Sequence, residues 1–308
     1  MKKYYTGLRI SHSENMPPPP FNGKGWRSNY ENYRRFRVED NCKEVVIHAS
    51  TQSAAQKALM LIIGSLNLFE GEVYLHLNDL VAFNRDEPKD LREDERYRVE
   101  NHSFSTINIP KACFIAAKAS YRKKYVYSII KYNFSTFLYS SFSVDLEPFR
   151  SPHLPISPYP EVHVRFAHSI ISAYSVLEEL GIELRASKDK PSMVNGNWNP
   201  PVKEDLEDRL RNSNINLNER FIWAIRGTKS RIEQKKSPLI RKKTPWAYGV
   251  VRDGEIEIID AIAYSSWLRS YVSSHKIKEI SESISPYDVI NCQSLSRYLI
   301  LDALKITF

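Results

Sequence analysis

The segment Ile258–Arg269 reads IIDAIAYSSWLR, and the chain continues from residue 270 as SYVSSH. This apolar run has helical character and predicts a helix that carries Arg269 near its end. His275 follows six positions later. A second helix is expected over Asp288–Leu304, close to the end of the sequence. Two successive helices here predict that this part of the protein is built by helix packing.

Helical patterns also dominate the residues that come before this pair. The segment Val162–Leu184 places apolar residues on one face at helical spacing, namely Phe166, Ile170, Ala173, Leu177 and Leu180. Asn199 followed by two prolines predicts the start of a helix over Val202–Asn212, because a polar cap and a proline suit a helix N-terminus. A third helix is expected over Leu217–Gly227. A small hairpin is expected around Asp253-Gly254, with flanks at Tyr248–Val251 and Glu255–Ile259.

The N-terminal half mixes strand and helix patterns. The first 40 or so residues contain four consecutive prolines, Pro17 to Pro20, and are expected to form an extended segment on the domain surface. Strands are expected at Glu44–His48 and Glu72–Leu77. Helices are expected at two places: Gln52–Leu66, capped by Ser50 or Thr51, and a long region from Pro110 to about Tyr139.

Five prolines fall between Pro148 and Pro160. Proline cannot continue a helix, so residues 148–160 are the expected connector between two domains. The sequence therefore predicts an α+β N-terminal domain over residues 1–150, followed by an all-α helical bundle over residues 161–308. A chain of 308 residues is long enough to give each domain its own core.

Composition narrows the cellular setting and the chemistry. No apolar stretch approaches the roughly 18 residues that a membrane span needs, and no signal-peptide pattern follows Met1. Cys42, Cys113 and Cys292 lie far apart and in no metal-ligand spacing, so they are expected to be reduced thiols packed in a cytoplasmic protein. The sequence also lacks the glycine-rich nucleotide-binding patterns, and His163 and His168 are poorly spaced for a metal, so neither a cofactor nor a metal is expected.

Positive charge is concentrated in one stretch. Arg226–Lys243 contains eight cationic residues and one anionic residue, in a chain whose net charge is +8. Such a stretch can attract a polyanion by releasing its counterions. It is equally compatible with a solvated basic loop that has no ligand.

Arg269 and His275 together suggest a chemistry. Arginine is a permanent cation that fits phosphate, and histidine moves protons near neutral pH. RNA is cleaved without a metal when a base deprotonates a 2′-hydroxyl, the oxygen attacks phosphorus, and an acid protonates the 5′-oxygen. Histidine serves for either proton transfer, and arginine stabilises the charge of the transition state.

The two side chains must reach one phosphate, which a single straight helix does not allow. Residues six apart on an α-helix point about 120° apart. Either the helix ends between Arg269 and His275, or two copies of the protein pair and share a site. Three serines, Ser270, Ser273 and Ser274, are poor helix formers and are compatible with a helix end. The alternative is a purely structural role, in which His275 caps the helix C-terminus. A cation there interacts favourably with the helix dipole, by about 0.3–1 kcal/mol.

An arginine four to six residues before a histidine, at the end of an amphipathic helix in a helical domain, resembles the HEPN superfamily. The resemblance covers roughly Glu161–Phe308 and implies a bundle of four to five helices. Active members of this family are metal-independent ribonucleases that dimerise to bring two motifs together. Many are toxins or effectors of antiviral defence.

The resemblance implies roles for individual residues. Arg269 takes the phosphate-binding position and His275 the acid/base position, while Ser270 stands where the family more often has Asn, Asp or His. An acidic residue on the first helix supports the arginine in the family, and Glu178 or Glu179 is expected to do so here. RNA binding is expected from the nearby cations Lys235, Lys236, Arg241, Lys242, Lys243 and Lys276.

Two functions follow from these patterns. The first is a homodimeric endoribonuclease that acts on RNA, with tRNA loops among the candidate substrates, in antiviral defence or as a toxin. The second is a non-catalytic HEPN-like binding or scaffold subunit of a larger nucleic-acid-associated or defence complex. The abundance of tyrosine, with 18 residues, favours an interface role because tyrosine is common at interfaces.

Overall fold

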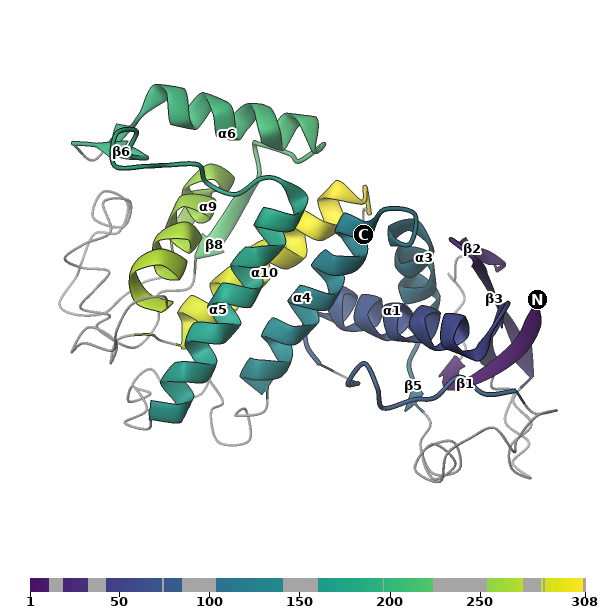
Figure 1. The fold of residues 1–308 in the computed structure, drawn as a ribbon. Coiled ribbons are helices and arrows are strands. Elements are labelled where there is room, and N and C mark those ends of the chain that lie inside the picture. The colour runs from purple at the N-terminus through teal and green to yellow at the C-terminus, as the bar shows by residue number, and fades with distance from the viewer. Residues whose placement is uncertain are drawn as a thin grey trace. The chain divides into compact units, whose positions relative to one another are not determined.

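The computed structural model describes residues 1–10, 19–32, 43–73, 75–84, 104–140, 160–195, 197–223, 254–273, 284 and 286–306. Within these residues the chain forms two compact units, Met1–Ile130 and Lys131–Phe308 (Figure 1). The division falls inside one helix, α4, which spans Lys123–Ser140. The expected connector at residues 148–160 lies outside the described residues except for Pro160, so the predicted division at that point stays a prediction.

The N-terminal unit is built on a five-stranded sheet with the order β2-β3-β4-β1-β5. Strand β1 pairs antiparallel with β4 and parallel with the short β5, while β3 pairs antiparallel with both β2 and β4. The bounds are β1 Lys2–Ile10, β2 Phe21–Gly23, β3 Trp26–Asn32, β4 Lys43–Ala49 and β5 Phe104–Ser105. The predicted strand at 44–48 is confirmed as β4.

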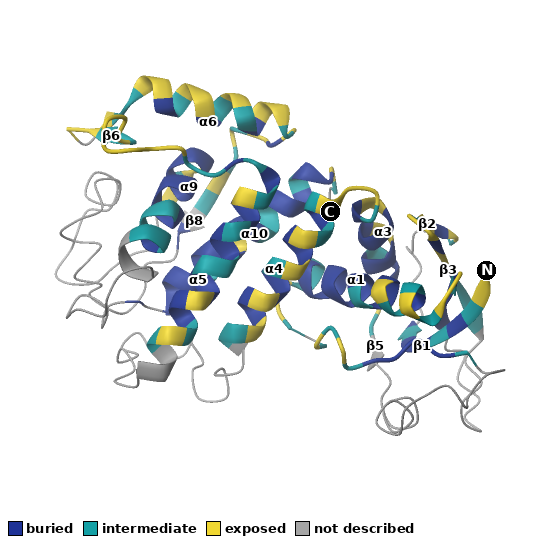
Figure 2. Ribbon diagram, viewed as in Figure 1, coloured by how far each residue is buried: buried dark blue, intermediate teal, exposed yellow. Residues whose placement is uncertain are grey.

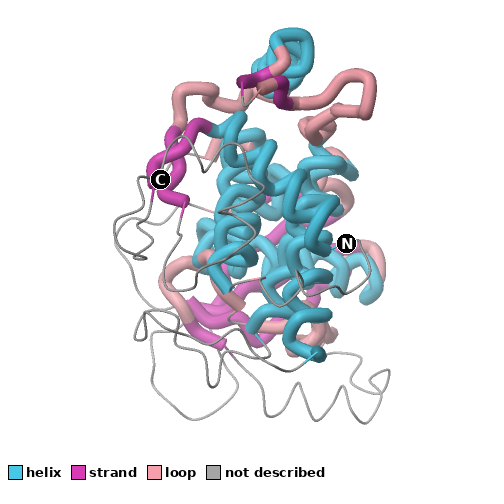
Figure 3. The backbone as a smooth tube through the Cα atoms, turned by 90° about the vertical axis from the view of Figure 1, so that its left-hand side faces the viewer, coloured by secondary structure: helices cyan, strands magenta, loops and turns pink. Residues whose placement is uncertain are grey.

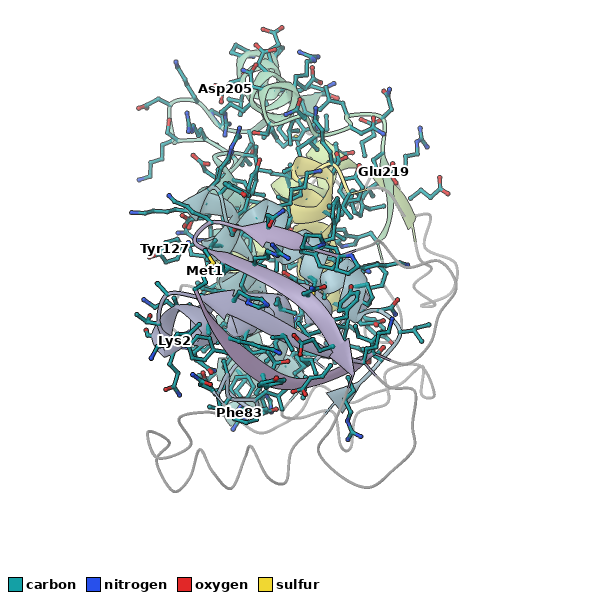
Figure 4. All side chains as sticks on the ribbon, turned by 90° about the vertical axis from the view of Figure 1, so that its right-hand side faces the viewer. Met1, Lys2, Phe83, Tyr127, Asp205 and Glu219 are labelled. Carbon is teal, nitrogen blue, oxygen red and sulfur yellow. The ribbon has the colours of Figure 1, made fainter. Side chains whose placement is uncertain are left out.

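One face of this sheet forms the core of the N-terminal unit. Most residues in the middle of β1 and β4 are buried, including Leu8, Val45 and Ile47 at 0 % exposure. Helices α1 (Gln52–Glu70) and α3 (Ile109–Ala119) pack against the strands, and Figure 4 shows the sheet in front of them. The expected surface segment over the first 40 residues is therefore wrong where the structure describes it. Strand β1 lies between β4 and β5, because its alternating apolar residues complete the core.

A buried carboxylate shapes the middle of β1. The pairing of β1 with β4 shifts register between Tyr5 and Arg9. Glu44 is 1 % exposed and accepts hydrogen bonds from the backbone N–H groups of Thr6 at 3.1 Å and Gly7 at 2.8 Å. Gly7 has φ of 76°, a conformation that glycine adopts without strain. The carboxylate thus satisfies two backbone donors that the irregular ladder leaves without strand partners.

Helix α1 has the expected start and a sharp end. Thr51 is the N-cap, and its hydroxyl accepts from the N–H of Ala54 at 3.1 Å. Gly71, in a left-handed conformation, ends the helix. The strand expected at 72–77 is wrong for the described residues, which form turns instead. Asn67 of α1 holds this segment by donating a side-chain hydrogen bond to the carbonyl of Leu75 at 2.7 Å.

The long helical region expected from Pro110 to about Tyr139 is confirmed, and it consists of two helices, α3 and α4. The break lies at Ser120–Arg122, where Ser120 caps α3. The Ser120 hydroxyl donates to the carbonyl of Ala117 at 2.7 Å and accepts from the N–H of Lys24 at 2.8 Å. A serine side chain that bonds to the backbone in this way competes with helix continuation, which explains the break.

The C-terminal unit contains the second half of α4 and a set of helices that matches most of the sequence predictions. Their bounds are α5 Pro160–Leu180, α6 Pro200–Asn212, α9 Ile258–Trp267 and α10 Pro286–Ala303. A π-helical segment, η2, continues α9 over Leu268–Ser273. The predicted apolar face of α5 is confirmed, because all five of its residues are buried. In Figure 1, α5 and α10 run alongside one another, and the two helices are in contact.

This unit is predominantly helical but not all-α, which corrects the sequence prediction. Two short antiparallel pairs are present: β6 (Met193–Val194) with β7 (Asn197–Trp198), and β8 (Arg220–Trp223) with β9 (Gly254–Glu257) (Figure 3). The helix expected at 217–227 is wrong, since residues 220–223 form strand β8. The expected flank at 255–259 is a strand only up to Glu257, and its partner is β8. The flank expected at 248–251 lies outside the described residues.

A buried polar network joins three helices of the C-terminal unit. Ser135 of α4 and Ser169 of α5 exchange hydrogen bonds with each other's carbonyls at 2.8 Å. Gln293 of α10 donates to both serine hydroxyls at 3.1 Å. Figure 2 colours most of α10 as buried. Because each of these polar groups has a partner inside the bundle, the network fixes the register of α4, α5 and α10.

No helix among the described residues is long and apolar enough to cross a membrane.

Candidate functional site

Arg269 lies where an α-helix changes into a π-helix. The α-helical hydrogen bonding of α9 ends at Trp267, and Arg269 is the second residue of η2. The sequence left open a helix end between Arg269 and His275, but α9 ends two residues before Arg269, and His275 lies outside the described residues. The chain nevertheless continues as one wider turn up to Ser273. Single π-helical turns are rare and occur frequently at functional sites.

The guanidinium of Arg269 is held by an acidic residue on α5. Its Nη2 donates a hydrogen bond to Oε1 of Glu178 at 3.2 Å. The two side chains are 42 % and 40 % exposed, so the ion pair is open to solvent. An exposed pair of this kind contributes roughly 0.2–1 kcal/mol to stability, and it orients the arginine more than it stabilises the fold.

A tyrosine ring lies beneath the same guanidinium. The Arg269 Cζ is 5.7 Å from the centre of the Tyr174 ring, within the range of a cation–π contact. Tyr174 is 4 % exposed, and its hydroxyl accepts from the N–H of Leu184 at 3.1 Å. Burial raises the pKa of Tyr174, so its phenol is neutral at physiological pH. The ring is thus a fixed, uncharged support for the arginine.

The structure distinguishes the two glutamates that the sequence left open. Glu178 contacts Arg269, whereas Glu179, the next residue of α5, pairs with Lys131 of α4 at 2.7 Å. Successive residues on a helix point about 100° apart, so they face different neighbours. Tyr174 was not predicted. The signal was present, because residues four apart share a helix face and Tyr174 is four residues before Glu178.

The remaining predicted site residues divide between described and undescribed segments. Ser270 follows Arg269 within η2 and is partly buried. The other members lie outside the described residues, so their predicted roles stay predictions: His275, Lys235, Lys236, Arg241, Lys242, Lys243 and Lys276.

The basic stretch Arg226–Lys243 lies in the sequence between strands β8 and β9, and β9 directly precedes α9. Trp223, at the end of β8, is the pairing partner of Gly254, at the start of β9. The two ends of the segment that contains the basic stretch are therefore held side by side. Strand β9 leads directly into α9 at Ile258.

Two tryptophans contact α9, one near its start and one further along the helix. The Trp198 indole N–H donates to the buried carboxylate of Asp260 at 2.8 Å. Trp223 meets the ring of Tyr264 edge to face, with 4.9 Å between the ring centres. Such pairs are worth about 0.5–1.5 kcal/mol beyond the area that they bury. The helix that carries Arg269 towards α5 is thus anchored by residues of β7 and β8.

Among the described residues, no group of three or more His, Cys, Asp or Glu side chains lies close enough together to hold a metal ion. No family model, curated protein or solved structure matches this chain. The geometry around Arg269 is therefore the feature of the described residues that bears on function. That geometry presents a solvent-accessible, oriented cation whose planar donor fork suits a phosphate oxygen pair.

Proposed function

We propose that this protein is a metal-independent endoribonuclease of the HEPN type, in which Arg269 binds the scissile phosphate and His275 transfers protons. One observation carries the proposal. A half-exposed arginine, oriented by Glu178 and supported by Tyr174, stands on a π-helical turn six residues before a histidine. A buried structural arginine has no need of solvent access, whereas a phosphate-binding arginine requires it.

The proposed reaction needs only protein side chains and the RNA. A base removes the proton from a 2′-hydroxyl, and the oxygen attacks the adjacent phosphorus. The bond from phosphorus to the 5′-oxygen breaks, an acid protonates that oxygen, and a 2′,3′-cyclic phosphate remains. His275 supplies one of the two proton transfers, and Arg269 stabilises the negative charge that builds up on phosphorus.

The two proton transfers are on opposite sides of the phosphorus, so one histidine in a fixed position does not serve both at once. A second copy of the chain would supply the second imidazole, which is why we propose a homodimer. The basic stretch Arg226–Lys243 would draw in the RNA by electrostatic attraction, with tRNA loops as candidate targets. An effector of antiviral defence or a toxin is the biological role that such an activity suggests.

The decisive test is RNA cleavage by the purified full chain in the presence of EDTA. Wild type should cleave, while His275→Ala and Arg269→Ala should each lose at least about a hundredfold in rate. Matched controls are His168→Ala, an exposed histidine on α5, and Arg185→Ala, whose side chain is 58 % exposed. Both controls should cleave like wild type. Cleavage that survives in both site variants, or that requires a divalent metal, would refute the mechanism.

A second test uses growth of bacteria that express the protein. Toxicity that disappears with His275→Ala but not with His168→Ala would support an intracellular nuclease. Equal growth of bacteria that express wild type, His275→Ala or His168→Ala would count against a toxin role. The cleavage assay in EDTA would still show whether the protein is a ribonuclease.

A non-catalytic binding or scaffold subunit is the second candidate. It is favoured by the unusual number of exposed apolar side chains on α4, among them Tyr127 and Phe134 at 52 % and 53 % exposure. On this alternative Arg269 only closes the contact between η2 and α5. The protein would then fail to cleave RNA, and Arg269→Ala would change neither RNA binding nor partner binding.

A further inference from the structure

The chain has one long segment without acidic residues, and much of it belongs to the N-terminal unit. Residues 101–144 contain no aspartate or glutamate, although the chain as a whole has 36 acidic residues. The described part of this segment within the N-terminal unit, residues 104–130, carries five cations on α3, on α4 and in the turn between them: Lys111, Lys118, Arg122, Lys123 and Lys124. Figure 2 colours that turn as exposed.

Three of these cations are consecutive and lie where α4 begins. Arg122 directly precedes the helix, Lys123 and Lys124 are its first two residues, and the first turn of α4 contains no acidic residue. A cation at a helix N-terminus opposes the helix dipole, so these three side chains do not stabilise α4. None of the three forms an ion pair with a carboxylate of the described residues. Their charge is therefore available to a ligand.

The turn between β2 and β3 adds a further cation next to this turn. The backbone N–H of Lys24 donates to the Ser120 hydroxyl at 2.8 Å, and the side chain of Lys24 is exposed. The Tyr121 hydroxyl donates to the carbonyl of Asn22 at 3.2 Å. These two hydrogen bonds hold the β2–β3 turn against the α3–α4 turn, within the same compact unit.

Exposed aromatic rings alternate with the cations. Phe114 and Lys118 are four residues apart and share one side of α3, and the Lys118 Nζ lies 5.7 Å from the centre of the Phe114 ring. Tyr121 follows in the turn. On α4, Tyr127 is four residues after Lys123 and shares its side of the helix. The three rings are 44 %, 58 % and 52 % exposed in chain order. Each exposed ring thus has a cation within one helical turn.

Cations and exposed rings in alternation fit a single-stranded nucleic acid. Lysine and arginine bind its phosphates, and aromatic rings stack on its unpaired bases. A duplex keeps its bases stacked on one another, so its base faces are not available to the rings. An anionic membrane fits less well, because membrane-surface helices gather apolar residues on one side and cations on the other. Here, insertion of the rings into lipid would bury the neighbouring charges.

We propose that the α3–α4 turn and the adjoining β2–β3 turn bind single-stranded RNA. This turn surface consists of Lys24, Phe114, Lys118, Tyr121, Arg122, Lys123 and Tyr127. Arg122 and Lys123 bind phosphates, and Tyr121 stacks on a base. The surface lies wholly in the N-terminal unit, so it is distinct from Arg226–Lys243. The binding of a single strand rests on the turn surface alone, whereas the choice of RNA over DNA rests on the proposed function.

The first test measures binding of the full chain to a labelled oligouridine of about 12 nucleotides, by fluorescence anisotropy over a range of salt concentrations. A 2′-O-methyl strand is used, because it lacks the attacking hydroxyl and is not cleaved. Arg122→Gln combined with Lys123→Gln should weaken binding by about tenfold or more and reduce the slope of log affinity against log salt by about 1.4. The matched control, Lys188→Gln combined with Lys190→Gln, removes the same charge from exposed positions of the C-terminal unit and should bind nearly as tightly as wild type.

Thermal unfolding followed by circular dichroism separates a loss of binding from a loss of folding. The variant with Arg122→Gln and Lys123→Gln should unfold at or above the wild-type temperature, because cations at this position oppose the helix dipole. A wild type that does not bind the strand, or a double variant that binds as tightly as its control, overturns the proposal. Tighter binding to the matching DNA strand, or to vesicles that contain phosphatidylserine, overturns RNA as the partner.

The second test asks whether Tyr121 stacks on a base. Tyr121→Ala should weaken binding of the oligouridine by about five- to a hundredfold and leave the salt slope unchanged, because stacking releases no counterions. Tyr121→Phe keeps the ring and removes only the hydroxyl that bonds to Asn22, so it should bind nearly like wild type. Equal affinities of the two variants would contradict stacking, as would equal affinity of wild type for the single strand and for its duplex with oligoadenosine.

The turn surface and the proposed nuclease fail in different experiments. A chain that binds the strand through Arg122 and Lys123 but cleaves no RNA in EDTA retains the turn surface and refutes the nuclease. A chain that cleaves RNA equally well with and without Arg122→Gln and Lys123→Gln, and whose binding they do not change, retains the nuclease and refutes the turn surface.

Discussion

From Lys131 onward, α4 lies beside α5, yet the two helices differ in how many polar side chains they bury and how many aromatic ones they expose. Helix α5 buries Phe166, Ile170 and Leu177 and exposes His168 and Glu178. Helix α4 buries Tyr132 together with serine, threonine and asparagine, and it exposes Phe134 and Phe137. The comparison teaches that α5 is positioned mainly by burial of its apolar face, whereas this part of α4 combines the buried Tyr132 ring with hydrogen bonds to α5 and α10.

The largest expected effect comes from truncating matched isoleucines on the two helices. Ile170→Ala removes a side chain that is 0 % exposed and should lower the free energy of unfolding by about 2–5 kcal/mol. Ile130→Ala removes one that is 40 % exposed and should cost less than about 0.5 kcal/mol in the monomer. Urea unfolding at low protein concentration measures both. Equal losses of unfolding free energy in the two variants would contradict the difference in burial between α5 and α4.

Thiol labelling gives an independent check of the two isoleucine variants, Ile170→Ala and Ile130→Ala. Cys292 of α10 is fully buried, and burial raises its pKa to about 12. At pH 8 it should therefore react only when the bundle opens, because the thiolate is the reactive form. In a Cys42→Ser background, Ile170→Ala should accelerate labelling of the buried thiols and Ile130→Ala should not. Fast labelling of the unmutated bundle would contradict the assigned burial.

A smaller effect is expected from breaking the polar contacts that hold α4. Gln293→Leu removes the donor shared by the Ser135 and Ser169 hydroxyls and should cost about 1 kcal/mol. The loss is modest because each serine hydroxyl retains a carbonyl partner at 2.8 Å. Urea unfolding again measures it, with Gln293→Ala as a comparison that adds a cavity and should cost more. No loss in either variant would show that the network does not hold α4.

The smallest effect is expected at the arginine site. Glu178→Gln weakens an ion pair whose members are about 40 % exposed and should change stability by less than about 1 kcal/mol. Its effect should appear in RNA binding or cleavage instead, because Arg269 loses its orienting carboxylate. Glu179→Gln is the matched control on the adjacent residue and should leave RNA cleavage unchanged. A large stability loss from Glu178→Gln alone would assign the pair a structural role.

Local signals predicted much of the fold. The N-cap at Thr51, the apolar face of α5 and the proline start of α6 each depend on residues within a few positions of one another, and each is confirmed. Strand β1 was missed because the nearby prolines favoured a surface segment. Its alternation of Tyr4, Leu8 and Ile10 with polar residues was nevertheless a usable strand signal.

Long-range pairings were not predictable in the same way. Strand β8 pairs with β9 across 30 intervening residues, and no local pattern specifies a partner so distant in sequence. The helix expected at 217–227 failed for this reason, since the pairing with β9 overrides the local preference. At the candidate site, Arg269 was predicted from its spacing to His275, while its contact with Tyr174 depended on how η2 meets α5.

The sequence by itself determined where most helices begin and end, because caps, prolines and apolar periodicity act within a few residues. It also singled out Arg269. Only the tertiary structure decided that Glu178 rather than Glu179 holds this arginine, and that α4 buries Tyr132 while it exposes Phe134. Both outcomes depend on which neighbour each helix face meets, and that is fixed by packing between segments far apart in the chain.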